Sequence, residues 1–296
     1  MKLAAIDIGS NAARLLISES ITDAQGKTRF NKLNLVRVPL RLGFDVFDTQ
    51  TISPEKTEHI LKTIKAYRAL IDVYGVNHYL ACATSAMRDA KNSAAIIDRI
   101  KAETGVEIKV ISGDEEASFI YENHIAENLD NDHSYMYIDV GGGSTELTFF
   151  SDNRLVFKES FNIGTIRLLK QQVDDNKWDE MKNYIRARTK GFKEIICIGS
   201  GGNINKVFSM SKKKDGKPLQ LDLLKDYYKE LNSFNVEERM RVYNLREDRA
   251  DVIVPALSIF INVMRWADAK EIYVPKIGLA DGLIQILWRQ LGRPTN

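Results

Sequence analysis

Residues 137–147 combine side chains and glycines that suit phosphate chemistry. An apolar run leads to Asp139, a run of three glycines follows, and Ser-Thr-Glu closes the stretch before apolar residues resume. Consecutive glycines lose side-chain packing, but they let a backbone approach a ligand closely and direct successive N–H groups at an anion. Ser144 and Thr145 add hydroxyl donors, while Asp139 and Glu146 add carboxylates suited to a hard cation such as Mg²⁺. The stretch predicts a phosphate and metal site, with a tight glycine hairpin as the purely structural alternative.

A similar arrangement occurs near the start of the chain. In residues 6–11 an apolar run again carries an aspartate, Asp7, just before a turn of small and polar residues. Asp139 follows Asp7 by 132 residues, and a second apolar run comes directly after both turns. Strand, turn and strand in this spacing are typical of a hairpin. The repeated hairpin therefore predicts a duplicated domain.

The apolar pattern predicts the element order β-β-β-α-β-α-β-α in each half of the chain. In the first half we expect strands at 3–6, 13–18, 33–40, 78–83 and 106–111, and helices at 54–74, 92–104 and 114–128. In the second half we expect strands at 135–140, 147–150, 155–161, 194–198 and 271–274, and helices at 165–188, from 203, within 221–267 and at 278–290. We therefore predict an α/β fold of two similar domains, 1–126 and 127–296, with a ligand-binding cleft between them.

Composition limits the classes of function. The chain has 296 residues, of which 44% are hydrophobic and 28% charged, and its net charge is +2. A nearly neutral chain is not a general DNA-binding protein, so any affinity for a polyanion must come from local clusters of charge. Cys82 and Cys197 lie in apolar runs and are expected to be reduced core residues. With Asp7 too early for a signal peptide and no apolar run of about 18 residues, we expect a cytoplasmic protein without a membrane span.

Doubled Asp-Gly hairpins in two such domains resemble the superfamily of actin, heat-shock-70 proteins and sugar kinases, whose domains have a ribonuclease-H-like (actin-like ATPase) fold. Within it, several segments are similar to the exopolyphosphatase/guanosine pentaphosphate phosphatase family, Ppx/GppA. They are residues 5–11, 111–117, 138–147 and 199–203, with weaker support from 83–88 and 278–283. The segments span the chain in the family's order, so their combination is much more specific than any one of them.

The resemblance implies roles for the acidic residues. Glu116 matches the base that activates water, and it lies between a predicted strand and a predicted helix. A carboxylate within reach of water can act as a general base. The alternative is that Asp114, Glu115 and Glu116 only complement the dipole at the start of a helix. The remaining matched acids, which would surround the metal and the water unless they have a turn role, are Asp139, Glu146 and Asp7.

The resemblance also implies phosphate and nucleoside contacts. Terminal phosphates would be held by the two hairpins and one arginine, namely Gly9, Ser10, Asn11, Gly141, Gly142, Gly143, Ser144, Thr145 and Arg88. Arg14, just past the first turn, is left open as a phosphate contact. A nucleoside would lie at Gly199, Ser200, Gly201 and Gly202, although such a glycine turn is equally common as a simple strand–helix connection.

The function implied is hydrolysis of a terminal phosphoanhydride by water, with Mg²⁺ or another divalent cation as cofactor. The substrate would be inorganic polyphosphate, guanosine pentaphosphate (pppGpp, converted to ppGpp), or both. The alternatives are an ATP-dependent kinase of the superfamily and a non-catalytic alarmone or polyphosphate sensor. The intact Asp139, Glu146 and Glu116 argue against the sensor. Ala12 and Ala280 keep it open, because the family often has a hydroxyl or a basic residue at these positions. Longer family members carry C-terminal helical domains, so short chains or alarmones gain weight as substrates here.

Two further stretches each have two interpretations. Residues 211–217 place four lysines in a glycine-containing loop, which is either a solvated loop or a rim that binds a polyanion. The last predicted helix carries an apolar face that is either core or the face of a homodimer. That face consists of Leu283, Ile284, Ile286, Leu287 and Trp288.

Overall fold

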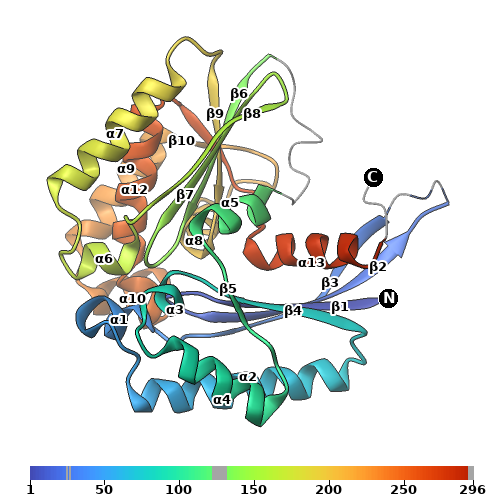
Figure 1. The fold of residues 1–296 in the computed structure, drawn as a ribbon. Helices are drawn as coiled ribbons and strands as arrows, with labels where there is room; N and C mark the ends of the chain where they lie inside the picture. Colours follow the sequence, from blue (N-terminus) through green and yellow to red (C-terminus); the bar gives the residue numbers. More distant parts are fainter. Residues whose placement is uncertain (25, 27, 122–131, 293–296) are drawn as a thin grey trace. The chain divides into compact units, whose positions relative to one another are not determined.

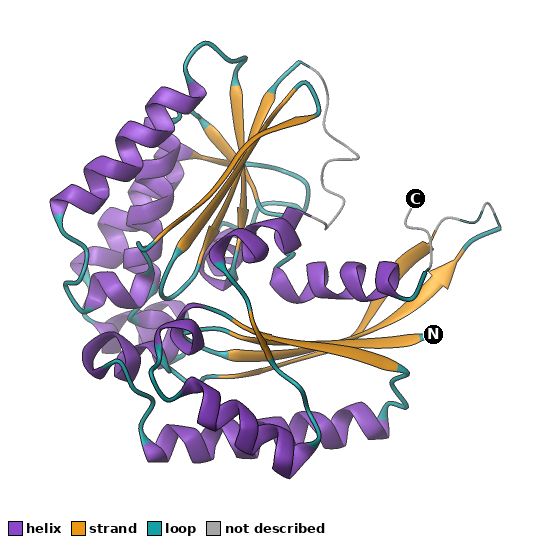
Figure 2. Cartoon of the chain, in the orientation of Figure 1, coloured by secondary structure: helices purple, strands orange, loops and turns teal. Residues whose placement is uncertain are grey.

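The computed structural model describes residues 1–24, 26, 28–121 and 132–292, which fall into two compact units (Figures 1 and 2). Unit 1 comprises Met1–Asn123 together with Leu279–Asn296, and unit 2 comprises His124–Gly278. The domain boundary predicted between residues 126 and 127 lies outside the described residues. Each unit contains one mixed β-sheet and its own helices.

Unit 1 is built on a five-stranded sheet in the order β3-β2-β1-β4-β5. β1, β2 and β3 pair antiparallel, whereas β4 and β5 continue the sheet in parallel. Figure 1 shows α2 and α4 along one face of this sheet and α13 along the other. The elements are β1 (Lys2–Ile8), β2 (Ala13–Thr22), β3 (Thr28–Val38), α1 (Gly43–Thr49), α2 (Pro54–Val73), β4 (His78–Ala83), α3 (Ser85–Asp89), α4 (Ser93–Thr104), β5 (Lys109–Val110), α5 (Gly113–Tyr121) and α13 (Leu279–Gln290).

Unit 2 repeats this plan with one additional strand, in the order β10-β11-β9-β6-β7-β8. β6, β7 and β8 pair antiparallel, β9 and β11 continue in parallel, and β10 joins the edge antiparallel to β11. The predicted duplication is confirmed, since β8-β7-β6-β9-β11 reproduces the order in unit 1. The elements are β6 (Ser134–Val140), β7 (Thr145–Ser151), β8 (Arg154–Phe161), α6 (Thr165–Leu169), α7 (Asp175–Thr189), β9 (Ile195–Ser200), α8 (Gly202–Met210), β10 (Leu219–Gln220), α9 (Leu221–Ser233), α10 (Val236–Tyr243), α11 (Glu247–Ala250), α12 (Ile253–Trp266) and β11 (Glu271–Tyr273).

Local signals explain several of the boundaries. Ser53 caps α2 by accepting a hydrogen bond from the N–H of Lys56 at 3.4 Å, and Pro54 occupies the first helical position, where the helix was predicted to begin. The helix predicted over residues 165–188 is instead two helices, α6 and α7. Gln171 has a left-handed φ of 55°, and Asp174 caps α7 by accepting from the N–H of Lys177. α1, α3 and β10 were not predicted, because elements of this length carry little periodicity.

The last helix does not belong with the second domain, contrary to the predicted division at 127–296. α13 packs on β1, β2, β4 and α5 of unit 1. Its buried face, Leu283, Ile284, Leu287 and Trp288, joins Leu3, Ala5 and Leu16 in one hydrophobic cluster. Of the two interpretations of this apolar face, the structure supports core. The sequence could not assign the helix, because an amphipathic face does not specify which sheet it covers.

No helix in the described part of the chain is long and apolar enough to cross a membrane. Cys82 and Cys197 are both buried free thiols, as expected. Cys197 lies in the large core cluster of unit 2, and Cys82 lies in the cluster under α13.

Trp288 tests the assignment of α13 to unit 1. Its side chain is 4% exposed, and its ring meets the Phe30 ring edge-on at 5.5 Å between centroids. We expect Trp288→Ala to lower the free energy of unfolding by about 3–5 kcal/mol, because it leaves a cavity in the core. Urea unfolding followed by circular dichroism measures this. Val73→Ala is the control, since Val73 is 82% exposed. Equal stability of the two variants would contradict the packing of α13.

Candidate active site

The two predicted hairpins have the same geometry. In unit 1 the turn between β1 and β2 closes with the N–H of Gly9 donating to the carbonyl of Ala12 at 3.0 Å. In unit 2 the turn between β6 and β7 closes with Gly141 donating to Ser144 at 2.9 Å. The offset of 132 residues therefore holds through both turns, and structurally equivalent positions can be compared directly.

The strand register places different charges at equivalent positions. Asp7 pairs with Arg14 across the first hairpin, whereas Asp139 pairs with Glu146 across the second. The Arg14 guanidinium lies 2.7 Å from the buried Asp7 carboxylate and forms an ion pair with it. Glu146 is buried too, and its carboxylate accepts a hydrogen bond from the hydroxyl of Ser160 at 3.0 Å. The first hairpin is therefore internally neutralised, whereas the second brings two carboxylates together.

The carbonyl groups of the glycine turn in unit 2 accept hydrogen bonds from residues 165–167. The carbonyls of Gly141 and Gly142 accept hydrogen bonds from the N–H groups of Thr165 and Ile166, at 3.0 and 2.8 Å. The carbonyl of Gly143 accepts from the Nε of Arg167 at 2.8 Å.

In a trans peptide the N–H points opposite to the carbonyl of the preceding residue, and every described peptide bond is trans. The amides that follow the three carbonyls, those of Gly142, Gly143 and Ser144, are therefore directed away from α6. Successive amides turned to one side suit an anion.

Gly164 is required for this contact. A Cβ added to Gly164 would lie 2.5 Å from the carbonyl carbon and oxygen of Gly142, which no real Cβ tolerates. Thr145 strengthens the same junction, because its hydroxyl donates to the carbonyl of Ile163 at 2.5 Å. Thr145 is thus held as part of the scaffold of the turn.

The turn between β1 and β2 in unit 1 is held in place by hydrogen bonds from the segment that follows β3. The carbonyls of Ser10 and Asn11 accept from the N–H groups of Gly43 and Arg41, at 2.8 and 2.9 Å. Arg41 adopts a left-handed φ of 54°, an unfavourable conformation for a non-glycine residue that the surrounding contacts must stabilise.

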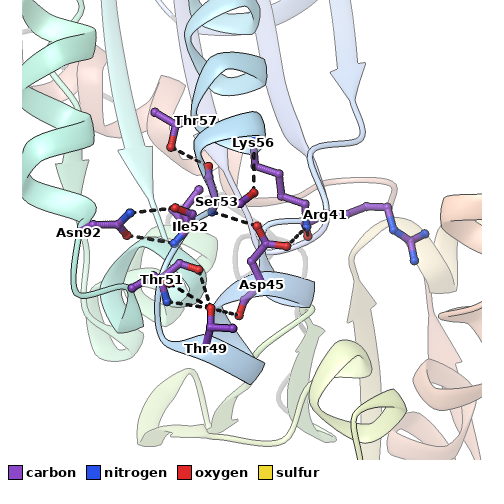
Figure 3. A network of polar contacts seen from close by, with 9 residues as sticks. All are labelled: Arg41, Asp45, Thr49, Thr51, Ile52, Ser53, Lys56, Thr57 and Asn92. Carbon is purple, nitrogen blue, oxygen red and sulfur yellow. Dashed lines mark hydrogen bonds and ion pairs between the residues drawn. The ribbon is translucent and has the colours of Figure 1, made fainter.

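Figure 3 shows the polar network that holds this segment. The ammonium of Lys56 donates to the carbonyl of Arg41 at 2.7 Å and to the carboxylate of Asp45 at 2.6 Å. Asp45 also accepts from the N–H of Ser53 at 3.0 Å. Burial by itself would raise the pKa of Asp45, but the hydrogen bonds from Lys56 and Ser53 outweigh it and hold this pKa below its ordinary value. The Arg41 side chain points away from the network, and its guanidinium lies over the Phe44 ring at 4.0 Å.

Three segments of unit 1 meet where the parallel strands β1, β4 and β5 end. The hydroxyl of Ser10, after β1, lies 2.7 Å from the hydroxyl of Ser85, after β4. Arg88 donates to the carbonyl of Ile111, after β5, at 2.8 Å. The carboxyl edge of a sheet is the usual ligand-binding edge in α/β folds. The structure therefore brings Ser10 and Arg88 to the same edge as the segment that carries Glu116.

The three consecutive acids at the start of α5 have different environments. Glu115 forms a capping box with Ser112, because each residue's side chain accepts a hydrogen bond from the other's backbone N–H. Hydrogen bonds from Lys109 and from the Ser112 backbone lower the pKa of Glu115. Asp114 is exposed, whereas Glu116 is 7% exposed. The helix-terminus role thus belongs to Glu115, and Glu116 is the buried carboxylate at this edge.

Cys82 lies in register with Asp7 on β1 and with Lys109 on β5. Burial raises the pKa of the Cys82 thiol to about 12, and the negative charge of Asp7 contributes. The thiol is therefore protonated at neutral pH, so Cys82 is not a nucleophile.

The glycine segment 199–203 follows β9 and adjoins the second hairpin. A Cβ at Gly201, where φ is 101°, would lie 3.0 Å from Oδ1 of Asp139. Gly199 is needed for packing, because a Cβ there would lie 2.8 Å from Ile272. Gly202 is approached by the Arg249 guanidinium, which also donates to the Asn203 side chain at 2.5 Å. This segment places the backbone of Gly201 beside Asp139 and brings the Arg249 guanidinium to Gly202, while its predicted contact with a nucleoside stays a prediction.

Sequence reasoning missed two arginines. Arg41 lies at the first hairpin and Arg249 at the start of α8. The left-handed backbone of Arg41 leaves no sequence signature, and Arg249 reaches Gly202 from 47 residues away in the chain. A contact between separate elements of this kind carries no local signal.

The carboxylates of unit 2 fit a magnesium ion that is completed by substrate. Among the described residues no group of three or more His, Cys, Asp or Glu side chains could hold a metal by itself. Mg²⁺ is usually bound through one or two carboxylates, with phosphate oxygens and water as the other ligands. Asp139 and Glu146 are a donor set of this type, whereas Asp7 carries the ion pair with Arg14 that a metal would have to share.

Comparison with known proteins gives a consistent result. Residues 21–289 match the Ppx/GppA phosphatase family. The chain is 31% identical to a bifunctional 3-dehydroquinate synthase/phosphatase of Fusobacterium nucleatum, over 81% of this chain and 35% of that protein. It is 27% identical to exopolyphosphatase 1 of Mycobacterium tuberculosis, over 60% of this chain and 50% of the relative. The chain thus spans half or less of the length of these curated relatives.

The fold is shared over the whole chain with a solved structure. The crystal structure of an exopolyphosphatase from Cytophaga hutchinsonii superposes with a TM-score of 0.83 at 26% identity and covers both chains completely. The ribonuclease-H-like, actin-like fold expected for the two units is confirmed by this similarity and by the strand orders.

The network around Asp45 predicts a pH dependence of stability. Because the folded-state pKa of Asp45 is lowered, its contribution is present above the unfolded value of 3.8 and is lost as pH falls through the folded value. We expect Asp45→Asn to lower the free energy of unfolding at pH 7 by about 1.5–3 kcal/mol, as for hydrogen bonds to charged groups. The deficit should shrink in acid. Urea unfolding between pH 3 and 7, a range set by that pKa, measures both effects. Asp72→Asn is the control, because Asp72 is exposed and forms a surface ion pair with Arg68.

The Gly164 contact predicts a second effect. We expect Gly164→Ala to displace the glycine turn and to lower the rate of phosphate release from a phosphoanhydride about 100-fold, since misplacement by about 1 Å has this effect. Stability should fall by about 1–3 kcal/mol. Gly278→Ala is the comparison for stability, because its Cβ would meet no atom within 4 Å. Full activity of Gly164→Ala would show that the turn does not bind the reacting group.

Proposed function

The chain belongs to the Ppx/GppA phosphatase family, and from this premise we propose that it hydrolyses the terminal phosphoanhydride bond of inorganic polyphosphate. The observation that carries the proposal is the second hairpin. The carbonyls of its glycines accept hydrogen bonds from residues 165–167, so the amides face the other side. Asp139 and Glu146 are paired across the two strands of the same hairpin. One element thus offers donors for a phosphate and carboxylates for the cation that accompanies it.

Each group in the proposed reaction has a defined task. A water oxygen attacks the terminal phosphorus, and the carboxylate of Glu116 accepts the proton of that water. The bond between the terminal phosphorus and its bridging oxygen breaks, giving orthophosphate and a chain shorter by one phosphate. In unit 2 the amides of Gly142 and Gly143 would stabilise the charge on phosphoryl oxygens, and in unit 1 Arg88 and Ser10 are further candidate phosphate contacts. The supporting observations are the burial of Glu116 and the anchoring of Arg88 beside its segment.

We propose Mg²⁺ as the cofactor, held by Asp139 and Glu146. Bound there, it would neutralise negative charge on the phosphoryl group. The two carboxylates would otherwise repel each other across the strand pair, so the cation also relieves a cost within the protein. Ser160 would orient Glu146, because its hydroxyl donates to one carboxylate oxygen.

Inorganic polyphosphate is the substrate that we propose first, and guanosine pentaphosphate is the second candidate. The named relative in Mycobacterium tuberculosis and the solved structure from Cytophaga hutchinsonii are both exopolyphosphatases. The Gly201 backbone beside Asp139 and the Arg249 guanidinium beside Gly202 support guanosine pentaphosphate as the second candidate, because a bare backbone and a cation in this segment could receive a nucleotide. Phosphate release from both compounds, measured in parallel with Mg²⁺, distinguishes them.

Neighbouring glutamates provide a matched test of the base. We expect Glu116→Gln to lower kcat for phosphate release by about 10²–10⁴-fold, the contribution of a general base, while substrate binding is retained. Glu115→Gln should keep its kcat and lose about 1 kcal/mol of stability, because Glu115 caps α5. Initial rates, with calorimetric binding of polyphosphate, measure both.

Three outcomes would contradict the proposal. If Glu116→Gln turns over like the wild type, Glu116 is not the base. If the two variants lose activity equally, the effect belongs to the fold of α5 and not to the chemistry. If the wild type releases phosphate from neither compound but binds one of them tightly, the chain is a sensor.

A further inference from the structure

The segment that joins α8 to β10 carries a concentration of positive charge. We call residues 211–217 the lysine loop; its four lysines and its single aspartate are all exposed. The N–H of Lys217 donates to the carbonyl of Lys214 at 3.1 Å, and Gly216 has a φ of 80°, so the tip is a defined turn. The loop is therefore a shaped, charged protrusion of unit 2.

The lysine loop is not neutralised from within the protein. Its one acid, Asp215, forms an ion pair at 2.6 Å with Lys276 from the segment after β11. Lys213 donates to the carbonyl of Pro218, which carries no charge. None of the four loop lysines has a carboxylate partner in the part of the chain that the structure describes. Five lysines, Lys276 included, face one aspartate, and the local formal charge is +4.

The strand register places the loop on the same sheet edge as the glycine turn. Leu219 pairs with Ile272, Ile272 with Cys197, and Cys197 with Met136, so all four lie at one level of the sheet. β10 runs opposite to β6. The chain before Leu219 therefore approaches the edge at which β6 delivers Asp139. Three strand spacings separate β10 from β6, which is a distance of about 14 Å along this edge.

A distance of about 14 Å exceeds the Debye length of about 8 Å at physiological salt. The loop therefore has little direct effect on a phosphate group bound at the glycine turn. A long polyanion can interact with the loop even when only its end is bound at the turn. Its remaining charges continue along the sheet edge and can reach the lysines. Charge clusters of this kind bind polyanions through many weak contacts that salt screens.

We propose that the lysine loop binds the trailing part of a long inorganic polyphosphate chain while its terminal phosphate lies at the glycine turn. This proposal rests on the polyphosphatase function proposed above and adds a residue set for chain-length preference. The loop thus gives unit 2 a subsite of its own for long substrates.

The test compares two double variants on two substrates. Lys212→Gln/Lys214→Gln removes two loop charges, and Lys190→Gln/Lys193→Gln removes two from the segment before β9, at the opposite edge of the same sheet. We expect the loop variant to raise KM for long-chain polyphosphate about ten-fold more than it raises KM for tripolyphosphate, since two ionic contacts to the trailing phosphates are lost. The control variant should change neither KM. The difference in KM for long-chain polyphosphate between the loop variant and the control variant should disappear at about 1 M salt, where the Debye length is about 3 Å.

Direct binding separates this proposal from the proposed function. Calorimetry with long-chain polyphosphate reports on the loop even if no phosphate is released, and absence of release alone would overturn only the hydrolase. The loop proposal is overturned if the loop variant binds long chains like the wild type. It is overturned if KM for tripolyphosphate rises equally, because the loop would then act on the reacting group. It is overturned, too, if the loop variant loses affinity for a single-stranded oligonucleotide and keeps it for polyphosphate.

Discussion

The close approach of Gly164 to the glycine turn is the contact on which the geometry of the second hairpin depends. Only a residue without a Cβ can bring its backbone against Gly142, and only this approach lets residues 165–167 occupy the carbonyls of the turn. Because those carbonyls are occupied, the amides face the other way. The three glycines therefore serve two purposes. Their carbonyl side packs against residues 164–167, and their amide side faces the place proposed for the ligand.

Duplication gave the protein two equivalent hairpins, and one position separates their chemistry. Arg14 and Glu146 occupy the same place in the register, opposite Asp7 and Asp139 respectively. In unit 1 the charge of the aspartate is balanced within the chain. In unit 2 the buried carboxylate of Glu146 stands opposite the partly buried carboxylate of Asp139, an arrangement that would suit a divalent cation. The hairpin with two acids is therefore the one for which we propose a metal, whereas the ion pair of the other hairpin links its two strands.

Features that depend on residues close together in the sequence could be predicted from the sequence. Apolar periodicity predicted the hairpins, the longer helices and every strand except β10, and the spacing of Asp7 and Asp139 predicted the duplication. Features that depend on distant contacts were not predictable. The face of α13 fits any apolar surface, so its place in unit 1 could not be read from Leu283 or Trp288. Arg41 and Arg249 act through backbone strain and through a contact between helices, neither of which leaves a local pattern.

The two sheets differ at one edge, where the sheet of unit 2 has the additional strand β10. β5 and β11 are equivalent, and each is followed by a loop on the carboxyl edge of its sheet. After β5 the chain enters α5 directly, and this places the carboxylate of Glu116 at the edge. In unit 2 the sheet continues to β10, whose opposite direction brings the lysine loop to that edge beside Lys276. The segments that follow β5 and adjoin β11 thus carry different charges, the buried carboxylate of Glu116 in unit 1 and exposed lysines in unit 2.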